Sequence, residues 1–110
     1  MSEGSEAIVS VYATFGSEEE AQRIARVVVE ERLAACANVL APCLSIYRWQ
    51  GRIEEAKEVP AIFKTRADAA GRLVERIRAL HSYDVPAAVV WPIADALADY
   101  LRWVVDEVER

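Results

Sequence analysis

The chain has 110 residues, near the usual size of a single domain, so we expect residues 1–110 to fold around one core. Its 13 Lys and Arg against 18 Asp and Glu give a formal net charge of -5, which argues against a nucleic acid partner because phosphate binding depends on clustered basic residues. No apolar run approaches the ~18 residues that a membrane helix needs, and the acidic start MSEGSEAIV lacks the basic residues of a secretory signal. We therefore expect a cytoplasmic protein without a membrane partner, in which Cys36 and Cys43 are reduced thiols.

The first two elements are expected to be a strand and a helix. Residues 7–14, AIVSVYAT, are β-branched and mostly apolar, which is typical of a strand covered on at least one face. Residues 16–36 carry apolar side chains at helical spacing, and Ser17 with Glu20 three positions later has the pattern of a capping box. This segment predicts a helix that ends at Cys36.

Two β-rich runs follow, residues 37–50 and 52–65, with Gly51 between them. They predict a long antiparallel hairpin. Because proline cannot donate a ladder hydrogen bond, Pro42 and Pro60 predict bulges or edges within these strands.

The rest of the chain predicts a helix, a strand and a terminal helix. Residues 67–82 place apolar side chains at i, i+3, i+4 and i+7, and residues 85–93 form a short β-rich run between prolines. The order β-α-β-β-α-β plus a helix predicts an α+β, ferredoxin-like domain, with two helices covering one face of an antiparallel sheet. In residues 94–110 the apolar stripe of the terminal helix is made of Leu97, Leu101, Val104, Val105 and Val108.

The predicted hairpin is longer than a four-stranded sheet of this kind needs. It should project beyond its own helices, carrying Ile46, Tyr47, Trp49 and Ile53 without enough cover from its own chain. Another subunit is the natural cover, so we expect an oligomer.

Five segments carry a resemblance to a known family: ERLAACANVL, SIYRWQGRIEEAKEV, FKT, ALHSYDVP and YLRWV. In order and spacing, from about Val9 to Val105, they resemble the signature blocks of the CutA divalent-cation tolerance family. The resemblance implies a ferredoxin-like subunit that assembles into a homotrimer through its long hairpins, with an architecture similar to the PII-type signalling proteins. It also implies a role in tolerance to divalent metals, with copper binding in some members.

The resemblance implies only weak binding of Cu(II) or another divalent cation by this chain. In family members with a proposed copper site, a cysteine ends the first strand and two adjacent histidines follow the second helix. These positions fall on Ala13, Leu80 and His81 here, so His81 is the one remaining candidate metal ligand. A structural role for His81 as a helix-end residue is the alternative.

Other residues with metal-binding chemistry have simpler interpretations. Cys36 and Cys43 are expected to be inert packing residues, because two thiols alone do not make a zinc site. The carboxylates of the hairpin are expected to be a solvated edge that discourages aggregation, with weak binding of hard cations as the alternative. These carboxylates belong to Glu54, Glu55 and Glu58.

Four residues are candidates for a subunit interface or a ligand pocket: Tyr47, Trp49, Lys64 and Tyr83. Tyr47 and Trp49 are expected to be interface anchors, with a ligand-stacking platform as the alternative. Lys64 would contact the ligand if the protein were instead a PII-like module that binds a small anion in clefts between subunits.

We expect no enzymatic activity, since Cys36 and His81 form the only thiol and imidazole pair and their spacing does not show that they meet. A further partner, protein or small molecule, stays open.

Overall fold

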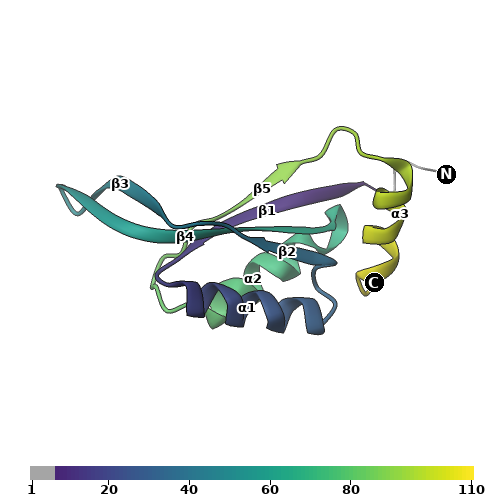
Figure 1. The fold of residues 1–110 in the computed structure, drawn as a ribbon, viewed down its shortest axis with the longest axis horizontal. Helices are drawn as coiled ribbons and strands as arrows, with labels where there is room; N and C mark the ends of the chain where they lie inside the picture. The colour runs from purple at the N-terminus through teal and green to yellow at the C-terminus, as the bar shows by residue number, and fades with distance from the viewer. Residues whose placement is uncertain (1–6) are drawn as a thin grey trace.

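Five antiparallel strands and three α-helices make up residues 7–110, the part of the chain that the computed structural model describes. Figure 1 shows α1 and α2 along one side of the sheet and α3 at the end remote from the projecting hairpin. The first six residues of the acidic start, on which the absence of a secretory signal is predicted, lie outside the described residues. The elements run in the order β1 (Ile8–Phe15), α1 (Glu18–Glu30), β2 (Cys36–Val39), β3 (Cys43–Trp49), β4 (Arg52–Arg66), η2 (Ala67–Ala69, a 3₁₀ helix), α2 (Ala70–Leu80), β5 (Ala88–Pro92) and α3 (Ala98–Glu107).

Strand β4 organises the sheet. It is 15 residues long and pairs with β1, β2 and β3, and the strand order is β2-β4-β1-β5 with β3 also on β4. Residues 37–50, predicted as one arm of the hairpin, are divided into two strands, because the partner of β4 is broken between Val39 and Cys43. Pro42 lies in this break, as expected for a residue without a backbone N–H, and the N–H of Leu40 still donates to the carbonyl of Pro60 at 2.9 Å.

The main core lies between the sheet and the two helices α1 and α2. Alternate residues of β1 point toward the helices, and the register places Val11 opposite Phe63 and Phe15 opposite Val59. The helices contribute the apolar stripes that their sequence periodicity predicts. Their buried members in this core are Ala21, Ile24, Ala25, Val28, Leu73 and Ile77.

Helix α1 begins as predicted but ends earlier. The Ser17 hydroxyl accepts the N–H of Glu20 at 3.1 Å, which is one half of a capping box. The helix stops at Glu30, and Arg32 adopts a positive φ of 63°, a left-handed conformation that often follows a helix end. The prediction that Cys36 ends this helix is therefore wrong: Cys36 is the first residue of β2.

A second, smaller core lies under α3. Val104, Val105 and Val108 pack with Ile8 at the start of β1, which confirms most of the predicted stripe. Leu97 does not belong to it, because it precedes the helix and its side chain is 77% exposed. None of the helices formed by residues 7–110 is long and apolar enough to cross a membrane.

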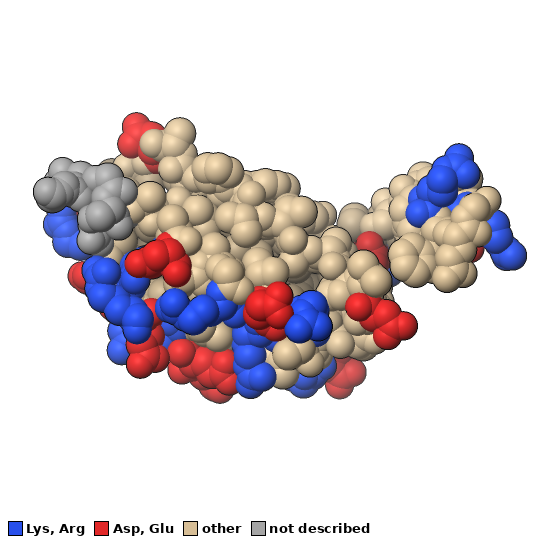
Figure 2. Space-filling model, turned by 180° about the vertical axis from the view of Figure 1, so that it is seen from behind, with Lys and Arg blue, Asp and Glu red and all other residues tan. Residues whose placement is uncertain are grey.

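The β3–β4 hairpin projects beyond the helices, as predicted (Figure 1). In Figure 2 the charged side chains gather along the lower, helix side and at the hairpin tip. The upper surface of the molecule in this view is almost free of charge. Exposed apolar residues occur both on the hairpin and on β5. They are Leu44, Ile46, Tyr47, Trp49, Ile53, Val89, Val90 and Trp91.

Candidate functional site

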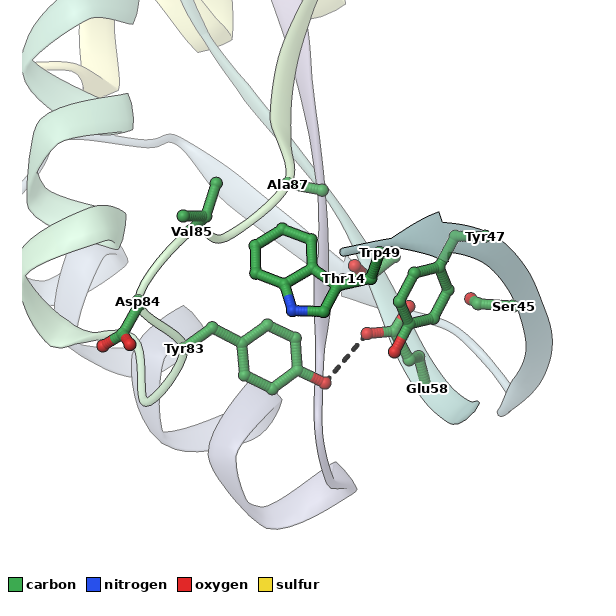
Figure 3. Close-up of a pocket in the computed structure, with 9 residues that line it drawn as sticks. All are labelled: Thr14, Ser45, Tyr47, Trp49, Glu58, Tyr83, Asp84, Val85 and Ala87. Carbon is green, nitrogen blue, oxygen red and sulfur yellow. Dashed lines mark hydrogen bonds between the residues drawn. The ribbon is translucent and has the colours of Figure 1, made fainter. Parts of the chain in front are cut away.

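A pocket of about 610 Å³ lies between the projecting hairpin and the loop that follows α2 (Figure 3). Its size is typical of small-ligand sites. The hairpin, the end of β1 and residues 83–87 all contribute to its wall. The lining residues are Thr14, Ser45, Tyr47, Trp49, Glu58, Tyr83, Asp84, Val85 and Ala87.

The hairpin side of the pocket follows from the antiparallel register. Side chains alternate between the two faces of a strand, so Ser45, Tyr47 and Trp49 share one face of β3. Cys43 pairs with Glu58, which places the Glu58 side chain on that same face. The turn that sets this register has positive φ at both central residues, 51° at Gln50 and 81° at Gly51, as in a type I′ hairpin turn.

The loop side of the pocket is attached to the hairpin through Tyr83. Its hydroxyl donates a 2.8 Å hydrogen bond to Oε2 of Glu58, drawn as a dashed line in Figure 3. Burial, the hydrogen bond to Glu58 and the negative charge of Glu58 raise the pKa of Tyr83 to about 12. The phenol therefore stays protonated and keeps donating over the whole neutral range.

His81 lies two residues before Tyr83 and is the capping residue at the C-terminal end of α2. Its Nε2 is 2.7 Å from the carbonyl oxygen of Thr14, and its Nδ1 accepts the N–H of Tyr83 at 3.1 Å. Because a carbonyl only accepts, the proton lies on Nε2 and the imidazole is neutral. The ring also stacks on Phe15 at 4.9 Å. Both nitrogens thus have protein partners, and a metal could bind His81 only by displacing one of them.

Glu20 fixes the start of the same loop. Its carboxylate accepts the N–H of Ser82 at 2.7 Å, the Ser82 hydroxyl at 3.1 Å and the N–H of Gly16 at 3.4 Å. Burial by itself would raise the pKa of Glu20, but the hydrogen bonds from Ser82 and Gly16 outweigh it, so the pKa lies below its usual value. Glu20 therefore holds the loop as a carboxylate, in place of the reciprocal contact to its own helix cap that the sequence pattern predicts.

Three of the four predicted pocket residues come together, and one does not. Tyr47, Trp49 and Tyr83 line the same pocket. Lys64 is absent from its lining; it pairs with Ser10 and Cys36 in the middle of the sheet. The prediction of Glu58 as part of a solvated edge is wrong, because the residue is only 9% exposed and bonded to Tyr83.

Among the described residues, the thiols and the remaining acidic side chains do not form a metal centre. Cys36 Sγ lies 3.4 Å from the Tyr100 hydroxyl, and Cys43 Sγ lies 3.9 Å from the Ser45 hydroxyl. No group of three or more His, Cys, Asp or Glu side chains suited to a metal ion occurs within residues 7–110. The contacts of Cys36 and His81 also lie in different places, so the structure does not bring this thiol and imidazole together.

An α+β domain with a projecting hairpin and a pocket at its base thus defines this protein, and comparison with known proteins gives its family. The CutA1 divalent ion tolerance protein family matches residues 9–107. The divalent-cation tolerance protein CutA of Pyrococcus horikoshii is 45% identical over 94% of this chain and 100% of its own length. The protein of that name from Thermus thermophilus is 48% identical over 86% of this chain and 91% of its own.

Solved structures agree with the sequence comparison. The divalent cation tolerance protein from Thermus thermophilus superposes with a TM-score of 0.90 at 44% identity, covering 93% of this chain and 99% of that one. The periplasmic divalent cation tolerance protein CutA from Archaeoglobus fulgidus gives a TM-score of 0.90 at 38% identity, again over 93% and 99%. The chain therefore belongs to the CutA1 divalent ion tolerance family, as its sequence blocks predict.

Proposed function

We propose that this chain is the subunit of a non-catalytic, ferredoxin-like homotrimer that acts in divalent-cation tolerance. The strand order supports the ferredoxin-like description, since β2 and β3 together replace one strand of that fold on the outer side of β4. The names of the relatives support the role in divalent-cation tolerance.

The uncovered apolar surface of the hairpin is the observation that supports the proposed trimer. Leu44, Ile46 and Ile53 share the hairpin face opposite the pocket, because Ile46 and Leu44 are two positions apart and Arg48, on the same face, pairs with Ile53. Their exposed fractions are 60%, 62% and 60%. A two-stranded ribbon with such a face is marginal in water, and burial against a neighbouring subunit stabilises it.

Sedimentation equilibrium at low micromolar concentration tests this proposal. We expect a trimer for the native chain and dissociation for Ile46→Asp, which places a charge within the proposed interface. Lys57→Ser, on the same hairpin face but without an apolar side chain, is the control and should stay a trimer. A folded native monomer at this concentration would contradict the proposal.

Metal binding by the chain is proposed to be weak and to involve His81. The described residues do not fit a preformed copper site, because the imidazole is satisfied on both sides and Ala13 and Leu80 supply no ligand. A Cu(II) titration of protein with an acetylated N-terminus, compared with a His81→Asn variant, tests this. We expect modest affinity that falls in the variant and at acid pH, since an imidazole must be neutral to bind. A submicromolar site that survives the substitution would place the ligands elsewhere.

A small-ligand module of the PII-like kind is the second candidate function, and the preformed pocket is the observation that favours it. The acidic lining disfavours the small anion expected for this function, because Glu58 and Asp84 would repel it and Lys64 lies elsewhere. Titration with small anionic metabolites should therefore give no heat at the pocket, whereas saturable binding lost on Lys64→Ala would restore the anionic alternative.

The cellular location is proposed to be the cytoplasm, because Cys36 and Cys43 are free thiols, as is usual for proteins of a reducing compartment. The Archaeoglobus fulgidus relative is described as periplasmic, so location is worth testing directly. Fractionation of cells that express the full chain should recover it with cytoplasmic markers; recovery with periplasmic markers would contradict the proposal.

A further inference from the structure

We propose that the pocket between the hairpin and the 83–87 loop binds a small organic cation, with an ammonium group held by Glu58 among the aromatic rings of Tyr47, Trp49 and Tyr83. This inference concerns a ligand of the single subunit and goes beyond the proposed tolerance function. It rests on the charge of the pocket, the chemistry of its rings and its position on the subunit.

The charge of the pocket has one sign. Glu58 and Asp84 line it, and no Lys or Arg does. Glu58 is 9% exposed, and within residues 7–110 no cationic side chain forms an ion pair with it. A carboxylate in such surroundings is stabilised by a positive ligand and disfavours a negative one. Asp84 lies at the rim with its carboxylate turned outward in Figure 3, so Glu58 is the anchoring group.

One Glu58 oxygen is available to the ligand. Oε2 accepts the Tyr83 hydroxyl at 2.8 Å, which fixes the carboxylate in place. Oε1 has no hydrogen-bond partner within the described part of the chain. A carboxylate oriented through one oxygen and open at the other is suited to accept a charge-assisted hydrogen bond from an ammonium or to pair with a quaternary ammonium.

The walls of the pocket suit an organic cation better than a metal ion. The rings of Tyr47, Trp49 and Tyr83 line the pocket together with Glu58 (Figure 3). Indole and phenol faces attract ammonium groups through their quadrupoles, and such aromatic enclosures bind choline-like groups in other proteins. The faces of these rings attract an ammonium group but do not coordinate a hard metal ion, and Val85 and Ala87 supply apolar surface for the methyl or methylene groups of an organic ligand.

The pocket is separate from the hairpin face assigned to assembly. Ser45, Tyr47 and Trp49 face the pocket, whereas Leu44, Ile46 and Ile53 point to the opposite side of the ribbon. A neighbouring subunit can therefore cover the aliphatic face and leave the aromatic face open to a ligand. If assembly fills the pocket instead, the assembled protein will not bind the cation, and the proposal is overturned.

Choline and its neutral isostere 3,3-dimethylbutan-1-ol are the probes, because they share shape and differ in charge. They are titrated into the native protein by calorimetry, and the indole N–H resonances are followed by NMR. We expect saturable binding of choline, at least about tenfold weaker binding of the isostere, and a shift of the Trp49 resonance but not of Trp91 or Trp103. Equal binding of the two probes, or no binding of choline, overturns the proposal.

A matched pair of variants locates the charge that matters. Glu58→Gln keeps the shape of the side chain and an acceptor for Tyr83, and should weaken choline binding by about tenfold. Glu55→Gln removes the same charge from the opposite face of β4 and should bind choline like the native protein. Equal weakening in both variants would reveal a general charge effect and overturn the assignment of Glu58. Sedimentation of each variant shows whether assembly is intact, so that failure of the trimer and failure of the cation site are read separately.

Discussion

The backbone N–H of Ser82 donates a 2.7 Å hydrogen bond to Oε2 of Glu20, which lies 62 residues earlier in the chain. This contact joins the start of α1 to the end of α2. It also fixes Ser82, which lies between His81 and Tyr83 at the start of the loop that lines the pocket. A single carboxylate in the first turn of a helix thus positions one side of the candidate site.

Replacing Glu20 by Gln should lower the free energy of unfolding by about 1–3 kcal/mol at neutral pH, because a buried acceptor of three hydrogen bonds loses its charge. The pKa of Glu20 is lowered in the folded state, so its contribution is present above the unfolded-state pKa and is lost as the pH falls through the folded-state value. Urea unfolding between about pH 7 and pH 3, at one fixed protein concentration, measures both effects. Glu19→Gln, an exposed neighbour, is the control; a native pH dependence in Glu20→Gln would contradict this account.

Replacing Tyr83 by Phe should destabilise the protein by about 1–3 kcal/mol, because the nearly buried Glu58 carboxylate loses its hydrogen-bond donor. Thermal and urea unfolding measure the change. Tyr12→Phe is the matched control, since Tyr12 stacks on Trp91 with ring centroids 5.0 Å apart and this stacking needs no hydroxyl. Equal effects in the two variants would show that the Tyr83–Glu58 bond contributes little.

Two glycines should respond to alanine with opposite signs. Gly51 has a φ of 81° in the hairpin turn, and no atom lies within 4 Å of an added Cβ, so Gly51→Ala should cost about 1 kcal/mol through backbone strain alone. Gly71 lies in α2 with equally open space, so Gly71→Ala should stabilise by about 0.5–1 kcal/mol. Urea unfolding of both variants checks the signs; stabilisation by Gly51→Ala would mean that the turn adopts another conformation.

Removing the Arg32 guanidinium should loosen the end of α3. Its Nε and Nη2 donate to the carbonyls of Glu107 and Asp106 at 2.9 and 3.0 Å, the kind of contact that stabilises a helix C-terminus. Arg32→Asn tolerates the positive φ at this position, so only the guanidinium is lost. We expect faster amide hydrogen exchange in residues 104–109 and a global loss of no more than about 1 kcal/mol, because the contact is exposed. Unchanged exchange at this end would show that the arginine does not hold the helix.

Local signals in the sequence determined most of the elements, the long hairpin and the family. Ser17 marks the start of α1, Gly51 marks the hairpin turn, and period-2 and period-3.6 patterns separate strands from helices, because each of these signals depends on neighbours along the chain. The early end of α1 was not predicted, because Arg32 adopts its left-handed backbone where its carbonyl accepts the N–H of Glu109, far along the chain. Pro42 predicted a bulge or edge, but the division into two strands depends on the pairing of Leu40 with Pro60 across the sheet.

The composition of the pocket was decided by tertiary structure alone. In the sequence, Glu58 has the pattern of an exposed carboxylate on a hairpin. In the folded molecule it is nearly buried and accepts a hydrogen bond from Tyr83, which lies 25 residues later in the chain. Burial and hydrogen bonding belong to the packed molecule, and they turn an edge charge into the anchor of a candidate site.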